Sequence, residues 1–562
     1  MPEKSPNKRI CSSLKNAVAV ISLTTLAATI PAIAQDAKAN PRVFFYPNNL
    51  VVSRSVYDNK ASNVTKGQIL PPNCANTQGG CSASSGAPYN GFYPSVWNND
   101  VYDGSFGITS KIFLDQMLPF GLVINSLEVP NNSEKGVTSK TNQLVTSFSS
   151  KSELALNLST NGQFLSFAGY VSPIDALDVS NSNTPGAVDP TNPVGENVYR
   201  AEALVDKYGL FQFTETNAYS GNNGRAVILN NSNGASFFYT AGNAGNGSNP
   251  QPNGVILGAG TQIISPAHVA EIDQNPSTPT PVGSFNVTEL GAKADKIGKD
   301  DNFRGLTIFN NVLYYSKGSG SNGVNTVYFL DTTGTACPNG VGLPSSSATL
   351  PTTPLAYNAA NLQTDGLPSN ICILAGFPDV PNKTATTLAY PFGMWFANAT
   401  TLYVADEGDG YAGGTDLYTH AAAQTTAGLQ KWIFDSSTST WNLAYTLQAG
   451  LGLGVPYTVK YYPTGNNAAT GLPWAPATDG LRNITGATAD GYAAIWGITS
   501  TISGNGDQGA DPNELVVIFD SLSNTDPKTA AEESFFTLRQ AGWGEVLRGV
   551  SFTPGTPISA SR

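Results

Sequence analysis

The sequence has few charged residues and very few histidines. Charged side chains make up 12% of the 562 residues, about half the usual share, and Gly, Asn, Ser and Thr take their place. The 2 histidines are too few for a zinc site built from three histidines. His268 or His420 could act as a general base, but nothing in the sequence places a nucleophile beside either one.

Long apolar runs are absent except for one near the N-terminus. The basic residues Lys4, Lys8, Arg9 and Lys15 precede the apolar run 17–30, and the small-residue pattern Ala32-Ile33-Ala34 follows it. This order predicts a signal peptide over residues 1–34 and a secreted or periplasmic mature chain. The alternative is a membrane anchor, but the run is shorter than the ~20 apolar residues that a spanning helix needs.

Basic residues are also few compared with acidic ones, with 29 Lys and Arg against 40 Asp and Glu. Its formal net charge is −11, and removing residues 1–34 takes away four basic residues and Glu3, which leaves −14. An acidic protein is poorly suited to nucleic acid or to an anionic membrane surface, since both attract basic proteins. We therefore expect a small anionic ligand or an extracellular protein or glycan as the partner, with no membrane insertion after signal cleavage.

Only 5 cysteines are present, and Cys11 lies within the expected signal peptide. The even number that remains predicts two disulfides in an oxidising compartment, Cys74–Cys81 and Cys337–Cys372. Thiolate catalysis or a zinc site is the alternative. Neither pair has the close spacing or the nearby histidine that zinc favours.

Helical periodicity is scarce, and only the segment from Asp526 to Glu533 suggests a turn or two of helix. Short β-rich runs bounded by Gly, Asn, Pro and Ser predict strands and turns instead. Examples are Asn49–Val56, Val312–Ser316 and Glu514–Asp520. A chain with this many strands is too large for one ordinary β-sandwich. A ring of repeated small sheets would protect the edges of the strands.

One unit recurs along the chain: an inner strand, a turn rich in Asn and Gly, and an aromatic second strand. Its copies open at Glu153, Arg225, Arg304, Phe392 and Arg482, and Arg548 opens a last inner strand. We expect an all-β, single-domain β-propeller over residues 35–562 with six blades, or seven if an insertion hides one. Tandem sandwiches are the alternative.

The two ends of the chain fit a closed ring. The inner strand from Arg548 has no second strand after it, and Leu50–Arg54 could supply one. Pairing the N- and C-terminal strands in one blade would close the propeller. The repeat spacing is long for a blade, so extended loops are expected at 181–197, 241–254, 339–370 and 462–480.

Several segments carry a family resemblance. Residues 156–170, 221–227 and Asn49–Val52 resemble a family of exported, largely uncharacterised bacterial β-propeller-like proteins. The strand Leu402-Tyr-Val-Ala-Asp406 is similar to that of NHL-type propeller repeats. The resemblance implies a propeller fold and export, and it supplies no activity and no catalytic residues.

Equivalent positions in a propeller lie at one level of the central channel. That level would hold one acid and four arginines near one mouth, namely Glu153, Arg225, Arg304, Arg482 and Arg548. Guanidinium groups bind carboxylate, phosphate or sulfate, which predicts a ligand-binding channel rim for an anion or a carboxylate-bearing chain end. The alternative is that each arginine bonds the neighbouring blade and locks the ring.

The turn after one predicted second strand is acidic. Asp406, Glu407 and Asp409, with glycines between them, could ligate Ca²⁺ through oxygen atoms. The turn lacks the full ligand series of a known calcium loop, and a solvated acidic turn is the simpler interpretation. No other cofactor is implied.

Two functions remain open, and the sequence does not decide whether the protein is an enzyme. A binding or scaffold protein fits the long loops and the lack of a catalytic motif. The alternative is a hydrolase or lyase for an anionic substrate, in which an arginine stabilises negative charge and an acid, with or without Ca²⁺, activates water.

Overall fold

The computed structural model describes most of the chain after the N-terminal segment. The described residues are 45–57, 93, 98–99, 103–134, 137, 143–150, 153–176, 200–216, 219, 223–242, 260–266, 302–318, 323–337, 339–352, 371–468, 471–505 and 509–558. The predicted signal peptide therefore lies outside them. Among the described residues, no helix has the length and apolar character needed to cross a membrane.

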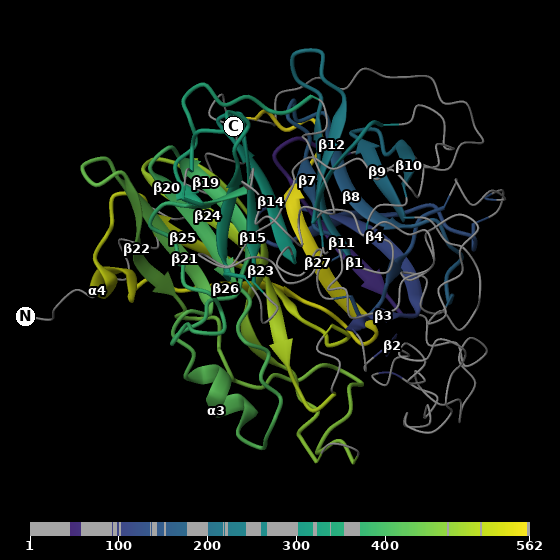
Figure 1. Ribbon diagram of the computed structural model, residues 1–562. Helices are drawn as coiled ribbons and strands as arrows, with labels where there is room; N and C mark the ends of the chain where they lie inside the picture. Colours follow the sequence, from purple (N-terminus) through teal and green to yellow (C-terminus); the bar gives the residue numbers. More distant parts are fainter. Residues whose placement is uncertain are drawn as a thin grey trace, which may run out of the picture.

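Six small, mainly antiparallel sheets are arranged around one axis, so the fold is the predicted six-bladed β-propeller (Figure 1). Blade 1 contains β27 (Glu545–Phe552), β1 (Leu50–Val56), β4 (Thr109–Met117) and β5 (Val123–Glu128). Blade 2 contains β7 (Asn157–Leu158), β8 (Phe164–Tyr170), β9 (Arg200–Asp206) and β10 (Phe211–Thr216). Blade 3 contains β11 (Gly224–Asn230), β12 (Phe237–Gly242) and β13 (Thr261–Ile264).

The other three blades follow in chain order. Blade 4 contains β14 (Phe303–Phe309), β15 (Val312–Lys317), β16 (Thr326–Leu330), β18 (Ile371–Leu374) and β17 (Val341–Gly342). Blade 5 contains β19 (Pro391–Asn398), β20 (Thr401–Asp406), β21 (Gly428–Asp435) and β22 (Thr440–Leu447). Blade 6 contains β23 (Ala477–Ala489), β24 (Tyr492–Ile502), β25 (Glu514–Ser521) and β26 (Phe536–Gln540).

Three more short strands add to the strands named above for the six blades. β6 (Thr146–Ser147) pairs with β4, and β2 (Asn98–Asn99) pairs with β3 (Asp103–Gly107).

α4 (Pro527–Ala530) confirms the predicted helical turn in shortened form, with Asp526 as its N-cap. α3 (Leu417–Ala422) was not predicted, and it contains His420.

The ring closes as the sequence predicted. β1, near the N-terminus, pairs antiparallel with β27, near the C-terminus, and Leu50 lies opposite Phe552. β1 also pairs with β4, so one blade contains strands from both ends of the chain. Three of the predicted loops need revision. β12 extends to Gly242, inside 241–254, β17 lies within 339–370, and β23 begins at Ala477, inside 462–480. The predicted loop 181–197 lies outside the described residues.

Each sheet packs both of its faces against neighbouring blades. β11 is buried at every position and β24 at all but its first residue. Strands covered on both faces become continuous apolar runs, which explains why alternation is weak in this sequence. Aromatic contacts join the blades, for example Phe309 of blade 4 stacked on Phe396 of blade 5 with 4.4 Å between ring centroids.

Candidate functional site

The predicted rim residues lie in or just before the inner strands, and most of them are almost completely buried. The exposed fraction is 1% for Glu153, 2% for Arg225, 4% for Arg482 and 3% for Arg548. The Arg304 side chain is 11% exposed. Buried charges need partners, so the contacts of these side chains indicate what each one does.

Arg225 and Arg548 hydrogen-bond backbone carbonyls outside their own sheets. Nη1 of Arg225, in blade 3, donates to the carbonyl of Phe303 in blade 4 at 2.8 Å. Nη2 of Arg548, in blade 1, donates to the carbonyl of Gly509, which precedes β25 of blade 6, at 2.9 Å. It also donates to the carbonyl of Phe148. These are contacts that hold neighbouring blades together.

Arg304 and Arg482 converge on one carboxylate. Nε of Arg482, in blade 6, lies 3.1 Å from Oε2 of Glu407, and Nη2 of Arg304, in blade 4, lies 3.8 Å from Oε1. Glu407 follows β20 of blade 5. The Arg304 guanidinium lies 5.8 Å from the ring centroid of Phe392, the equivalent residue of blade 5. Side chains from blades 4 and 6 therefore meet at Glu407 of blade 5.

Glu153 contacts residues of blade 2 and of β6, the short strand paired with blade 1. Its Oε1 lies 3.2 Å from Nη1 of Arg200 in β9, and the hydroxyl of Tyr170 donates to the same oxygen. Thr146 donates to Oε2 at 3.1 Å. Arg200 is 1% exposed and was missed by the sequence analysis, because it lies on the third strand, outside the repeat that was aligned.

The three acids of the predicted calcium turn point to different partners. Asp406 accepts hydrogen bonds from the backbone N–H groups of Tyr390 and Gly408, and burial raises its pKa to about 6. Glu407 binds the arginines described above. Asp409 Oδ2 lies 2.6 Å from Nε2 of His420. Among the described residues, these carboxylates do not form a cluster with oxygens within 4.8 Å of one another.

A fourth acid approaches the same turn. Asp479 in β23 accepts hydrogen bonds from the N–H of Gly410 at 2.8 Å and from Nε2 of Gln424 at 2.6 Å. Burial, with a smaller contribution from the charge of Asp409, raises the pKa of Asp479 to about 7. No motif marks Asp479 in the sequence, and its role depends on the packing of blade 5 against blade 6.

His420 is the histidine that the structure describes, and His268 lies outside the described residues. The imidazole pairs with Asp409 and stacks on the ring of Tyr411, with 4.1 Å between centroids. Its side chain is 39% exposed. The pair lies on the surface beside α3.

A cavity of about 90 Å³ occupies the central channel, farther along the inner strands than the arginines. Every inner strand contributes to its wall, and none of the lining side chains is charged. The polar lining residues are Asn157, Ser159, Thr160, Ser232, Thr307, Asn311, Thr485 and Ser551. The apolar ones are Leu156, Leu158, Ile228, Ile308, Leu350, Met394, Trp395, Ile484 and Ile558.

A second cavity, of about 200 Å³, lies away from the axis between blades 1 and 6. It is lined by apolar residues only, namely Pro119, Phe120, Ala494, Trp496, Val517, Phe519, Phe536 and Leu538. The indole N–H of Trp496 donates to the carbonyl of Pro119 at 2.8 Å. This contact joins the β4–β5 turn to blade 6.

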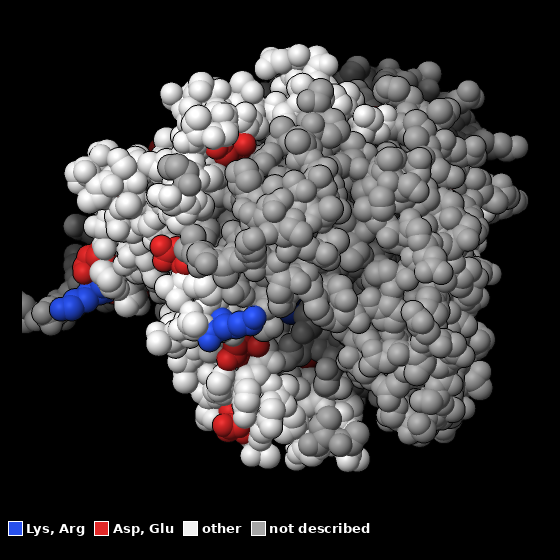
Figure 2. Space-filling view, in the orientation of Figure 1, with Lys and Arg blue, Asp and Glu red and all other residues white. Residues whose placement is uncertain are grey.

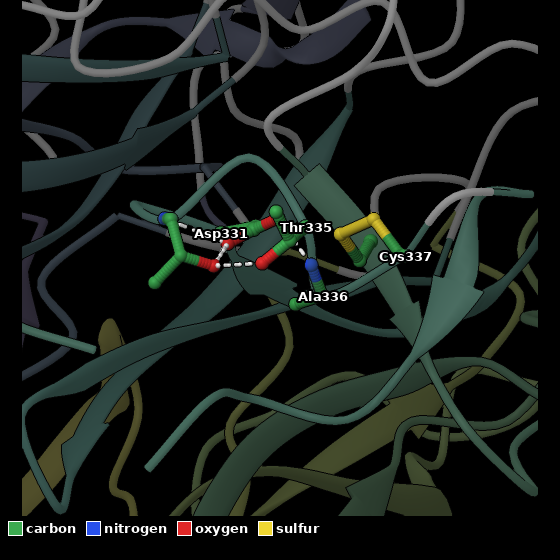
Figure 3. Close-up of a disulfide and its surroundings, with 6 residues drawn as sticks. Asp331, Thr335, Ala336 and Cys337 are labelled. Atoms are coloured by element: carbon green, nitrogen blue, oxygen red, sulfur yellow. Dashed lines mark hydrogen bonds between the residues drawn. A yellow bond between two sulfur atoms is a disulfide. The ribbon is translucent and has the colours of Figure 1, made fainter. Parts of the chain in front are cut away.

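The predicted disulfide between Cys337 and Cys372 is present and joins β18 to the segment after β16 (Figure 3). Asp331 lies beside it and accepts a hydrogen bond from the N–H of Ala336 at 2.9 Å. Ligand atoms of Asp331 and the two cysteines lie within 4.8 Å of one another. Sulfur atoms joined in a disulfide are not thiolate ligands, so this group is a covalent brace and not a metal site. Cys74 and Cys81 lie outside the described residues.

The described part of the surface in Figure 2 is mostly uncharged, with acidic and basic residues in small separated groups. This agrees with the low charged fraction of the sequence. No family model matches the chain, and no curated protein matches it. The function is therefore argued from the geometry of the channel.

Proposed function

We propose that the protein is a binding protein that takes a small, neutral, hydroxyl-rich group, such as the terminal sugar of a glycan, in the central channel. The observation that carries this proposal is the channel cavity, whose wall combines amide and hydroxyl side chains with Trp395 and aliphatic residues and contains no charge. Ligand sites are typically concave, with a few polar groups set among apolar and aromatic ones.

The chemistry of the wall suits a sugar. Hydroxyl groups of a ligand both donate and accept hydrogen bonds, as do the amide of Asn157 and the hydroxyls of Thr307, Thr485 and Ser551. Each inner strand is also the edge of its described sheet, so one row of its backbone groups is unpaired within that sheet. The volume of about 90 Å³ suits a terminal group, because pockets for drug-sized molecules are larger, about 300–1,000 Å³.

A second candidate is an anion held at the arginine end of the channel. It rests on the convergence of Arg304 and Arg482 at Glu407, together with Nε of Arg304, which has no hydrogen-bond partner among the described residues. A carboxylate or phosphate that displaced Glu407 could accept hydrogen bonds from both guanidinium groups.

One thermal-shift screen tests both candidates, using a panel of neutral mono- and disaccharides and a panel of small anions, with and without Ca²⁺. A saccharide that raises the melting temperature supports the channel site if Thr485→Val weakens its affinity about tenfold, since a lost hydrogen bond in a binding site costs about 1.4 kcal/mol. The exposed Thr384→Val is the matched control and should change nothing.

The part of the screen that uses small anions compares the wild type with Arg304→Gln. Lys528→Gln is the control, because Lys528 is exposed. A shift that depends on an anion and is lost only in Arg304→Gln assigns the ligand to the arginine end. A saccharide panel that produces no shift, or a shift that Thr485→Val leaves unchanged, contradicts the proposed channel site.

A further inference from the structure

A cluster of ionisable residues is buried between blades 5 and 6, away from the channel cavity. Lys431 in β21 and Asp520 in β25 have fully buried side chains, and Nζ of Lys431 lies 2.8 Å from Oδ2 of Asp520. Glu533, which follows α4, is the third member. The pair joins two different sheets, and no residue of the sequence repeat belongs to it.

The amine of Lys431 is held in one orientation. Nζ donates to the carbonyl of Ser521 at 2.7 Å and to that of Asn524 at 2.8 Å. A neutral amine has two N–H groups and one lone pair. If both N–H groups remain on these two carbonyls, the lone pair is left for the remaining side of the amine, where Asp520 Oδ2 lies at 2.8 Å and the hydroxyl oxygen of Tyr445 at 3.0 Å.

The carboxyl group of Asp520 receives hydrogen bonds from two tyrosines. The hydroxyl of Tyr403 donates to Oδ2, and that of Tyr445 donates to Oδ1. Donors fixed in a buried site stabilise negative charge that develops on an oxygen during attack at the carbonyl carbon. Asp520 is therefore placed as an electrophile as well as an ion-pair partner.

Glu533 supplies an exchangeable proton. Burial first, and then the nearby carboxylate of Asp520, raises the pKa of Glu533 to about 8. Its Oε1 accepts the N–H of Ser521 at 3.3 Å, which fixes the carboxyl group in place. Its Oε2 is buried and has no hydrogen-bond partner among the described residues.

We propose that Lys431 and Asp520 condense to form an intramolecular amide bond, with Glu533 as the proton relay. A proton passes from Nζ of Lys431 to the carboxylate of Asp520, and the lone pair of the neutral amine attacks Cγ of the protonated Asp520. Glu533 gives its proton to the departing hydroxyl, which leaves as water, and takes a proton from the attacking nitrogen, so Glu533 ends in its starting protonated form. The N–Cγ bond forms, the Cγ–O bond breaks, and one water molecule leaves, so no oxidant or other co-reactant is required.

The environment favours this reaction. Two groups held in contact react as if at very high concentration, with effective molarities of about 10⁵–10⁸ M in well-oriented cases. Formation of the amide also removes a buried ion pair, whose desolvation is costly. The product would join blades 5 and 6 covalently, in addition to the hydrogen-bonded closure between β1 and β27.

Peptide mapping of the purified full chain by mass spectrometry tests the proposal, after reduction and alkylation of the disulfide. We expect one peptide pair, containing Lys431 and Asp520, joined covalently and lighter than the sum of its two peptides by one water. Mapping by peptides makes the result independent of where the mature N-terminus lies.

Glu533→Gln is the decisive variant, since it keeps the shape of the side chain and removes its ability to relay a proton. We expect the two peptides of this variant to be separate and of full mass, whereas the neighbouring exposed Glu532→Gln retains the joined pair. Separate, full-mass peptides in the wild-type chain would overturn the proposal. So would a joined pair that is equally abundant in Glu533→Gln.

Discussion

Individual charged residues in this protein hold the ring together from the inside. Glu153 pairs with Arg200, and Arg482 pairs with Glu407, in each case with nearly complete burial. A buried charge is costly unless it is paired, so each of these contacts specifies how a strand must sit against its neighbour. With 12% charged residues in the whole chain, the use of several in the interior leaves fewer of them for the surface.

Glu202 in β9 is a buried acid for which the stability consequence can be tested. It is 2% exposed, and burial raises its pKa from 4.5 to about 8, with Arg200 opposing the shift. The folded chain therefore binds a proton more tightly than the unfolded chain. The stability contributed by protonated Glu202 is fully present below about pH 4.5 and is lost as the pH rises to about 8.

We expect Glu202→Gln to be more stable than the wild type above about pH 8, by about 5 kcal/mol, and nearly equal to it near pH 4.5. Urea unfolding across this pH range measures the difference. The exposed Glu532→Gln should show no such trend. A constant difference between Glu202→Gln and the wild type at all pH values would contradict the assignment.

At the scale of elements, the inner strands approach one another so closely that side chains are excluded. A Cβ on Gly305 of blade 4 would lie 2.0 Å from the carbonyl oxygen of Phe392 in blade 5, and one on Gly549 would lie 2.3 Å from that of Leu154. A serine on the second strand bridges the same gap. Ser53 accepts the N–H of Gly549 and donates to the carbonyl of Leu154, both at 2.8 Å.

Gly549→Ala tests this junction between blades 1 and 2. The added methyl group would clash with backbone atoms, which cannot rotate away as a side chain can, so we expect a loss of about 3 kcal/mol of stability. Gly542→Ala is the matched control, because its nearest neighbour is the end of the flexible Glu545 side chain at 3.3 Å. Denaturant unfolding of both variants provides the measurement, and equal stability would show that the blades can separate without cost.

The sequence pattern located most inner and second strands correctly, because runs of β-branched and aromatic residues bounded by turn residues mark strands locally. It missed α3 and placed the start of β23 too late. The register of β23 against β24 shifts between Thr478 and Gly480 and again between Leu481 and Ile484. Such irregularities depend on the neighbouring strand, so the chain segment alone does not show them.

At the scale of the whole molecule, closure of the ring depends on β27, the last of the described strands in chain order. β27 supplies the inner strand of blade 1, and its Val550 and Leu547 are almost completely buried. Without β27, the edge of β1 and the apolar faces of blades 2 and 6 would be exposed to water. An exposed edge of this kind also invites association with other chains.

We expect a chain ending at Trp543, which lacks β27, to lose its cooperative thermal transition and to aggregate. A chain that ends at Ile558 retains β27 and should melt as the full chain does. Calorimetry and size-exclusion chromatography measure the two outcomes. A sharp transition in the shorter chain would mean that the remaining five blades are stable as an open ring.

The sequence by itself predicted the fold class, the closure by the two terminal strands, the Cys337–Cys372 disulfide and a ring of six blades, with seven left open until the structure showed six. These follow from local patterns and from a repeat that can be aligned without coordinates. Only the tertiary structure decided how the charged and channel residues are used. Arg304 and Arg482 meet at Glu407, and Lys431 meets Asp520, across blades whose residues lie far apart in the chain. Side chains that are remote in sequence become neighbours through blade packing, and no local pattern records which of them will touch.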